Sequence, residues 1–536
     1  MRARSVVAAA AVLTLMAAGA GVTEGPPAAA DSAGPDLSRF YHQKITWRAC
    51  DGLPDNPEDM RCGKVTVPLD YADPGKGTVD IALARIAADT PGPKGSVLLN
   101  FGGPGGEGIS SLAAFGRTFN DFTNTYDVVT FDPRGVGRSS PVTCGNTRRP
   151  DINGMPPGAL LKAATAYYDA CRKASGPVFP YVGTMNVARD LDVMRQVLGD
   201  RKLNFLGFSY GTRLGAVYAA QFPHKVGRMV LDGVDTLTEP LTQQALVSAQ
   251  GQQTALDDFT AWCASRKDCA LGSNARDARQ SIVTLVHDLD AQPIPLGDGT
   301  VFAGPDLVNA LGAALYQQAN WLFLSRGLAD LIDNGDPSGL MVGGGPASAS
   351  HTPVSTVPAD NPEVALTAVN CADDPDRMTA ADLGDEAKYA RLLKEYEDAS
   401  PVFGAAQFTQ ILQCVGQPRG TDFIRKIRNV PAPKFLLVGT RGDPATPYRW
   451  TVETAKRLGD SAVVLDNRGE GHGAYLSSKC VRGKVDTFFL LGDLPASGSS
   501  CPASPETSAD LTTAAAEGTH QRTDAVHTPG EGVPDR

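Results

Sequence analysis

Three features are missing from this sequence of 536 residues, and each absence excludes a class of protein. No cluster of lysine and arginine covers a domain face and the net charge is −10, which excludes a basic nucleic-acid-binding surface. Its cysteines show no C-x-x-C spacing and have no histidine at zinc-ligand distance, so we expect no metal site. Beyond the N-terminal segment no apolar run reaches 18 residues, so we expect no membrane-spanning helix. Hydrophobic residues nevertheless make up 42% of the chain, enough for a substantial core.

The first 30 residues are typical of a secretory signal peptide. Arg2 and Arg4 precede an apolar stretch over residues 6–20, and Ala28 to Ala30 form an A-x-A-like cleavage site. A bacterial lipid anchor would require a cysteine directly after the apolar stretch, and none is present there. We therefore expect a secreted, extracellular monomer that does not bind membranes or nucleic acid.

Export makes the cysteines candidates for disulfide bonds. There are ten, an even number that leaves no obligatory free thiol. Because short loops lose less entropy when they are closed, we expect each cysteine to pair with its neighbour along the chain. The expected pairs are Cys50–Cys62, Cys144–Cys171, Cys263–Cys269, Cys371–Cys414 and Cys480–Cys501.

Between residues 45 and 235, buried strand-like runs alternate with helical segments. The runs cover residues 95–100, 126–131, 203–208 and 228–231. Val187, Leu191, Met194 and Leu198 recur at helical spacing, with Asn186 as the expected N-cap and Gly199 as the expected stop. This alternation indicates an α/β fold, with a mostly parallel sheet covered by helices on both faces.

A mainly helical stretch interrupts this pattern. Helices are expected over residues 255–265, 277–289, 307–333 and 386–396, and strands return at 434–439 and 462–465. We therefore expect the two halves of an α/β core to flank an inserted, mainly helical cap. The expected parts are a signal peptide (1–30), the first part of the core (31–235), the cap (236–425), the second part of the core (426–501) and a disordered tail (502–536).

The motif G-x-S-x-G occurs once, between a strand-like and a helix-like segment. It spans residues 207–211, after the run 203–206 and before the small-residue helix 212–222. In α/β-hydrolases this motif holds a nucleophilic serine on a strained turn between a strand and a helix. Ser209 is therefore the candidate nucleophile, and the expected fold class is the α/β-hydrolase fold.

A serine nucleophile needs a histidine base, and in this fold the base follows the acid along the chain. Six of the seven histidines are unsuitable, because they precede the acid, fall in the helical insert or fall in the tail: His42, His224, His287, His351, His520 and His527. The remaining one, His472, stands in a glycine-flanked loop after the strand 462–465. We expect His472 to be the base.

The orienting acid should follow the preceding strand. Asp443 lies in the loop after the run 435–439, and 29 residues separate it from His472, as 472 − 443 shows. Asp466 competes for the role, but it lies within the strand that leads to His472. Position therefore favours Asp443.

Acyl transfer also needs N–H donors for the developing oxyanion. One donor is expected from Tyr210, the residue after the nucleophile. The second is expected from the glycine-rich loop after the run 95–100, at Gly103 or Gly102. Glycine allows the backbone to approach a substrate closely.

Three motifs together resemble those of the secreted bacterial tripeptidyl aminopeptidases, a group of prolyl-aminopeptidase-like α/β-hydrolases. They are residues 100–106 (NFGGPGG), 131–139 (FDPRGVGRS) and 207–211 (GFSYG). The resemblance also takes in residues 188–192 and 443–447, and extends thinly to 316–321 and 368–373. It implies Ser209, Asp443 and His472 as a catalytic triad, and release of short peptides from a free N-terminus, without a metal or cofactor.

An aminopeptidase must also bind an ammonium group, which calls for carboxylates beside the pocket. The candidates are Asp373, which the resemblance favours, Asp374, Glu107 and Glu239. The alternative function is a secreted carboxylesterase or amide hydrolase on the same fold, which would need no amine anchor. A non-catalytic scaffold would have no need of the complete serine, acid and base set.

Overall fold

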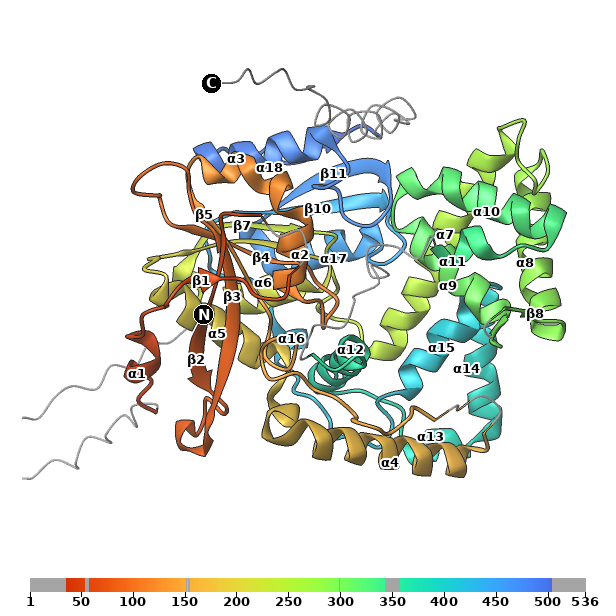
Figure 1. Ribbon diagram of the computed structural model, residues 1–536, viewed down its shortest axis with the longest axis horizontal. Coiled ribbons are helices and arrows are strands. Elements are labelled where there is room, and N and C mark those ends of the chain that lie inside the picture. Colours follow the sequence, from red (N-terminus) through yellow and green to blue (C-terminus); the bar gives the residue numbers. More distant parts are fainter. Residues whose placement is uncertain are drawn as a thin grey trace, which may run out of the picture.

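One ten-stranded sheet organises the molecule in the computed structural model, which describes residues 35–53, 57–150, 152, 155–297, 299–342 and 357–503 (Figure 1). The strand order is β1-β2-β3-β5-β4-β6-β7-β10-β11-β12. The strands are β1 (Arg48–Ala49), β2 (Met60–Pro68), β3 (Thr78–Ile86), β4 (Ser96–Asn100), β5 (Asp127–Phe131), β6 (Leu203–Phe208), β7 (Val226–Asp232), β10 (Phe435–Gly442), β11 (Ala462–Glu470) and β12 (Ser500–Cys501). Pairing is parallel from β5 to β12, and antiparallel among β1, β2, β3 and β5. The expected mostly parallel sheet is confirmed.

Helices cover both faces of the sheet (Figure 1). One face carries α2 (Gly108–Phe115), α3 (Asn120–Thr123) and α18 (Lys479–Leu491), and the other carries α5 (Thr184–Val197), α6 (Tyr210–Gln221) and α17 (Tyr448–Leu458). Along β4, Leu98 packs on the α5 and α6 side, while Val97 and Leu99 pack on the α2 and α18 side. Successive side chains of a strand point to opposite faces, so a strand covered on both faces is mostly apolar, as β4 is between its polar end residues Ser96 and Asn100.

The segment between β7 and β10 is mainly helical, which confirms the inserted cap. Its helices are α7 (Leu241–Ala264), α8 (Ala275–Ala291), α9 (Gly304–Leu315), α10 (Trp321–Asn334), α11 (Ser338–Val342), α12 (Asn361–Asp373), α13 (Ala380–Gly384), α14 (Glu386–Ala399), α15 (Gly404–Leu412) and α16 (Phe423–Lys426), with a small hairpin of β8 (Ile294–Pro295) and β9 (Val301–Phe302). Helices α7 to α10 enclose an apolar core of their own. A helix from the first half of the chain, α4 (Pro157–Ser175), packs against cap residues through Leu160. A short helix, α1 (Ser38–Tyr41), opens the described chain.

Two local expectations are wrong. The helix expected over 307–333 is two helices, α9 and α10, separated at residues 316–320 by a turn and the 3-10 helix η5 (Gln318–Asn320). The N-cap of α5 is Gly183, and Asn186 lies inside the first turn, where its side-chain amide donates to the carbonyl of Tyr181. The Asp373 carboxylate accepts the backbone N–H of Thr184, the first residue of α5, at 2.8 Å, so α5 begins earlier than its apolar periodicity suggests.

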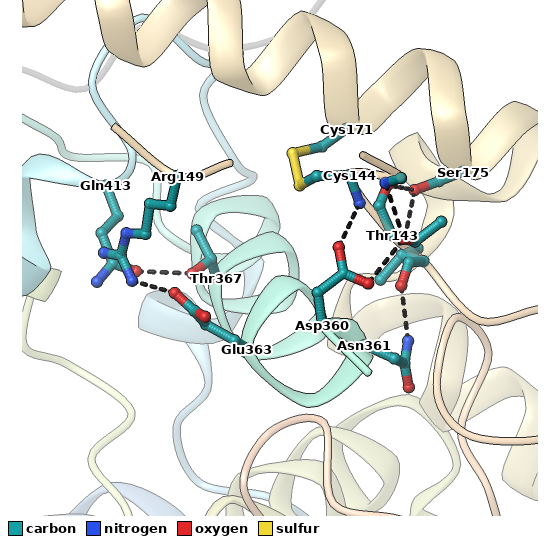
Figure 2. Close-up of a disulfide and its surroundings, with 12 residues drawn as sticks. Thr143, Cys144, Arg149, Cys171, Ser175, Asp360, Asn361, Glu363, Thr367 and Gln413 are labelled. Atoms are coloured by element: carbon teal, nitrogen blue, oxygen red, sulfur yellow. Dashed lines mark hydrogen bonds and ion pairs between the residues drawn. A yellow bond between two sulfur atoms is a disulfide. The ribbon is translucent and has the colours of Figure 1, made fainter. Parts of the chain in front are cut away.

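All five expected disulfide pairs are confirmed. The bonds join Cys50 to Cys62, Cys144 to Cys171, Cys263 to Cys269, Cys371 to Cys414 and Cys480 to Cys501. Figure 2 shows the second of these bonds beside the start of α12. Each pair closes a short loop, as the chain-entropy argument predicts.

Helix α12 is fastened to the core at its first turn (Figure 2). The carboxylate of Asp360 accepts hydrogen bonds from the hydroxyl of Thr143 and the backbone N–H of Cys144, both at 2.7 Å. The Asn361 side chain accepts from the N–H of Gly137 and donates to two carbonyls of residues 135–142. The turn 132–139 therefore helps to hold the cap helix α12 on the core.

None of the helices in the described part of the chain is long and apolar enough to cross a membrane. The expected signal peptide lies outside the described residues, as does the expected tail beyond residue 503.

Candidate active site

Ser209 occupies a strained turn between β6 and α6. Its φ is 54° and its ψ is −126°, a conformation that non-glycine residues rarely adopt and that is found at functional sites. The backbone holds this strain, because the Ser209 N–H donates to the carbonyl of Asp232 at 2.9 Å. Gly207 and Gly211 pack so closely that a Cβ on Gly207 would lie 2.5 Å from the Gly211 carbonyl oxygen. The close packing of the two glycines therefore allows the tight turn that places Ser209 between β6 and α6.

The glycine loop after β4 lies directly against the serine turn. Gly102 has a φ of +90°, and a Cβ there would lie 2.6 Å from the Phe208 carbonyl oxygen and 2.9 Å from Ser209 Cβ. The Gly102 N–H donates to the Asn100 side-chain oxygen at 3.2 Å. Among the described residues, the N–H groups of Gly103 and Tyr210 have no acceptor. Of the three expected donors, Gly103 and Tyr210 are therefore available to an oxyanion, while Gly102 is engaged.

His472 and Asp443 form a close pair at the ends of neighbouring strands. The His472 Nδ1 lies 2.9 Å from Oδ1 and 3.0 Å from Oδ2 of Asp443. The buried carboxylate also accepts the N–H groups of Ala445 and Thr446 and the hydroxyl of Thr446, at 2.8 to 3.0 Å. Burial lowers the pKa of His472, but the carboxylates of Asp443, Asp232 and Asp235 raise it, and their combined effect leaves the pKa above its ordinary value.

The end of β7 brings the serine turn and the histidine loop together. Asp232 accepts the Ser209 N–H through its carbonyl, and its carboxylate accepts the N–H groups of Ala474 and Tyr475, which follow His472. A Cβ on the next residue, Gly233, would lie 3.2 Å from His472 Cε1. Burial raises the pKa of Asp232 to about 6. One residue thus anchors both loops.

The competing acid, Asp466, has a different partner. Its two oxygens accept from Arg441 Nε and from a terminal Arg441 nitrogen, each at 2.8 Å. This ion pair lies between the adjacent strands β10 and β11, whereas Asp443 faces His472. Geometry therefore agrees with the positional preference for Asp443.

The candidate amine-binding carboxylates are distributed over two places. Asp373, Asp374 and Glu239 line one small pocket, together with Arg213. Glu107 does not line it, and instead accepts from the Ser110 hydroxyl at 2.7 Å.

Within the pocket, each carboxylate already has partners. Asp373 accepts from the backbone N–H and the hydroxyl of Thr184, at 2.8 and 2.5 Å. Glu239 pairs with Arg449 and accepts from the Trp450 indole at 2.7 Å. Burial raises the pKa of Asp373, while nearby Arg213 lowers it, and the net pKa is raised.

Three supporting residues were not found by sequence reasoning: Asn100, Asp232 and Thr446. Two of them, Asn100 and Asp232, are polar residues that end apolar strands, at β4 and β7. Polar residues at the carboxyl ends of parallel strands commonly face a site, so their positions carried a usable signal. Thr446 had no such sequence signal, apart from its place three residues after Asp443.

Two family models match the chain. One, described as TAP-like protein, matches residues 400–501, and the other, described as alpha/beta hydrolase fold, matches residues 95–278.

Curated relatives match over most of their length. Serine protease Hip1 of Mycobacterium tuberculosis is 31% identical, over 86% of this chain and 91% of the relative. Tripeptidyl aminopeptidase of Streptomyces lividans is 30% identical, over 87% of this chain and 88% of the relative. Carboxylesterase B of Mycobacterium tuberculosis is 31% identical, over 90% and 94%. Among solved structures, proline iminopeptidase of Mycobacterium smegmatis covers 80% of this chain and 100% of its own, at 13% identity and a TM-score of 0.36.

Proposed function

The chain belongs to the bacterial α/β-hydrolase family that includes the tripeptidyl aminopeptidases of Streptomyces, and from this premise we propose that it is a secreted serine exopeptidase. It releases short peptides, tripeptides above all, from the free N-terminus of a peptide. The observation that carries the proposal is the Asp443–His472 pair, whose loop Asp232 links to the strained turn of Ser209. Those are the groups that activate a serine for attack on an amide.

In the proposed reaction, Ser209 Oγ attacks the scissile carbonyl carbon and His472 Nε2 takes the hydroxyl proton. Asp443 keeps the other ring nitrogen protonated and stabilises the imidazolium. The N–H groups of Gly103 and Tyr210 stabilise the oxyanion, and each such donor typically contributes about 3 kcal/mol to the transition state. His472 then protonates the leaving amine, and water hydrolyses the acyl-enzyme by the reverse proton path. No metal or cofactor takes part.

The free N-terminus of the substrate is proposed to bind at the pocket of Asp373. Support comes from its three carboxylates and from its place beside the nucleophile helix, since Arg213 of α6 also lines it. Asp373 is the favoured anchor, because Glu239 is already neutralised by Arg449.

The test compares a tripeptidyl anilide that has a free N-terminus with its N-acetylated twin, using purified protein. The proposal expects hydrolysis of the free form only. Equal hydrolysis of both forms would contradict the exopeptidase and favour a general hydrolase. The Ser209→Ala variant, run beside them, separates enzymatic from background hydrolysis.

A carboxylesterase is the second candidate function. The specific observation in its favour is the relative named carboxylesterase B, which matches as much of the chain as the peptidases do. The same serine, histidine and aspartate would act on an ester without an amine anchor. Hydrolysis of p-nitrophenyl esters at rates far above those of free tripeptidyl anilides would favour it.

We further propose that residues 31–235 and 426–501 form the catalytic core of an extracellular monomer, with 236–425 as its cap. The five disulfides support export, because such bonds persist in oxidising compartments. N-terminal sequencing of the protein from culture medium tests this, with a mature start at Asp31 expected. Retention inside the cell with residues 1–30 intact would contradict it.

A further inference from the structure

The cap touches the proposed base directly. Tyr316, the residue at which α9 ends, accepts the backbone N–H of His472 through its carbonyl at 2.7 Å. Its ring also meets the His472 ring edge-on, with centroids 5.1 Å apart and planes at 78°. His472 is therefore held by Asp443 from the core and by Tyr316 from the cap.

The contact is a close one between two backbones. Gly471 has a φ of +91°, and a Cβ there would lie 2.8 Å from the Tyr316 carbonyl oxygen and 3.3 Å from Gln317 Cα. Only glycine fits this position, both in conformation and in space. The loop before His472 thus lies flush against the break between α9 and α10.

Tyr316 itself is partly exposed to solvent. It is 41% exposed, and its hydroxyl makes no hydrogen bond to any other described residue, whereas the preceding helix α9 is anchored in the cap core through Leu311 and Leu315. Tyr316 is therefore fixed through its helix rather than through its side chain, and any shift of α9 carries its ring and carbonyl along.

We propose that Tyr316 is a positioning residue for His472, which couples the orientation of the base to the seating of the cap. Asp443 fixes one ring nitrogen, but a single hydrogen-bonded edge leaves the ring free to tilt. The perpendicular Tyr316 ring restricts that tilt, and its carbonyl fixes the main chain of the histidine. The inference rests on the proposed function, because it assigns Tyr316 a role through the catalytic base.

The charges around His472 determine how loss of the Tyr316 ring would change the pKa of His472. The imidazole faces Asp443 at the end of β10, and Asp232 and Asp235 at the end of β7, all of which raise its pKa, while burial lowers it. Removing the Tyr316 ring exposes the imidazole to water, which weakens both the effect of burial and the attraction of the carboxylates. The raised pKa of His472 should then fall back toward its ordinary value, and the acid limb of the activity profile should move to lower pH.

The test measures the rate at which a fluorophosphonate labels Ser209, a reaction that needs the base but no peptide specificity. Tyr316→Ala should label about 10- to 100-fold more slowly, since small misplacements of a catalytic group have effects of that size, and its acid limb should move to lower pH. Tyr316→Phe keeps the ring and should stay within about twofold of wild type. Phe323→Ala, which removes an exposed aromatic from the same cap, is the matched control and should label at the wild-type rate.

Gly471→Ala is the second variant, which displaces the Tyr316 carbonyl while the tyrosine is kept, and it should slow labelling in the same way. Circular dichroism and thermal midpoints establish that each variant is folded. Wild-type labelling and an unmoved acid limb in Tyr316→Ala would overturn the positioning role. Absence of labelling in the wild type would instead overturn the proposed serine chemistry, and this inference with it.

Discussion

The imidazole Nδ1 of His472 is within hydrogen-bond distance of both carboxylate oxygens of Asp443, at 2.9 and 3.0 Å. An Nδ1–H that donates to the carboxylate leaves Nε2 free to accept a proton. Although burial alone would lower the pKa of His472, Asp443 and the nearby carboxylates of Asp232 and Asp235 together raise it above its ordinary value. The neutral base is consequently lost at a higher pH than an isolated histidine would require.

The first prediction concerns pH and Asp443. Wild-type kcat/KM should fall as pH drops through the raised pKa of His472, so the acid limb should lie above about 6.5, the ordinary histidine value. In Asp443→Asn the carboxylate charge is gone and burial still lowers the pKa, so the limb should move to lower pH. The rate should also fall by about 10⁴-fold, because the ring is no longer held in the productive tautomer. A pH profile of kcat/KM measures both effects.

Asp466→Asn is the matched control, because Asp466 is an aspartate of the neighbouring strand β11 but binds Arg441. Its rate and acid limb should stay close to those of wild type. A larger loss in Asp466→Asn than in Asp443→Asn would reverse the assignment of the acid.

The second prediction concerns the nucleophile. Ser209→Ala should lower kcat by about 10⁶-fold, the loss seen when a catalytic serine is removed from a complete triad. The fold should be intact, because the contacts that hold the turn come from the backbone N–H and carbonyl of residue 209. Active-site labelling and circular dichroism check the two statements. Ser281→Ala, on the surface of α8, is the control and should have full activity. Appreciable turnover by Ser209→Ala would rule out Ser209 as the nucleophile.

The third prediction tests the loop against the serine. In Gly102→Ala the new Cβ would meet Ser209 Cβ at 2.9 Å and the Phe208 carbonyl at 2.6 Å, so the loop must move away from the oxyanion position. We expect kcat to fall by at least 10²-fold, about the effect of losing one oxyanion donor. Gly92→Ala is the control, since Gly92 also has a positive φ, +74°, but nothing lies within 4 Å of its Cβ. It should be slightly destabilised yet fully active, and equal losses in both variants would point to backbone strain alone.

Strands buried on both faces were predictable, whereas the edge strands were not found. The runs at 95–100 and 203–208 are mostly apolar because helices cover both sides, and they contain β4 and β6. In contrast, β3 mixes buried and partly exposed positions near the sheet edge, and polar or charged residues interrupt its apolar residues on both sides of 81–84. The long helix expected over 307–333 fails for a related reason. Its apolar periodicity continues through the break, and only the distant contact between Tyr316 and His472 shows why the chain turns there.

The candidate site divides in the same way. Ser209, Asp443 and His472 each follow a strand at a position that the fold reserves for them, so local patterns were sufficient to nominate them. The contacts that orient them come from remote segments. Neither the acceptance of two N–H groups by Asp232 nor the packing of Gly471 on the cap has a local signature.

The fourth prediction concerns the proposed amine anchor. Asp373→Asn keeps an oxygen acceptor for Thr184 but removes the negative charge. It should raise KM for a free tripeptidyl anilide by about tenfold or more, as loss of a charge-assisted hydrogen bond implies, and leave kcat nearly unchanged. Steady-state kinetics measure this change.

Glu107→Gln is the control for the anchor, since Glu107 lies outside the pocket lined by Asp373. It should have a wild-type KM for the free substrate. A rise in KM with Glu107→Gln and none with Asp373→Asn would move the anchor to the glycine loop.

The last prediction concerns the stability of the turn 132–139, in which Arg134 is fully buried. Its guanidinium pairs with Asp190, at 2.7 and 2.6 Å, and donates to the carbonyls of Pro68 and Leu69. Asp190→Ala would leave a buried positive charge without its partner, which typically lowers the free energy of unfolding by about 3–5 kcal/mol. Denaturant unfolding monitored by circular dichroism measures this loss.

Asp398→Ala is the comparison for Asp190→Ala, because it also removes an ion pair, but one with Lys394 in which both side chains are largely exposed. Exposed pairs of this kind contribute about 0–1 kcal/mol, so its unfolding free energy should hardly change. The turn also carries Gly137, which the cap residue Asn361 binds. If the turn affects only stability, the activity of Asp190→Ala per folded molecule should equal that of wild type. A lower activity per folded molecule would mean that the turn also affects the reaction, through its contact with Asn361. An equal loss of stability in both variants would refute the structural importance assigned to the buried pair.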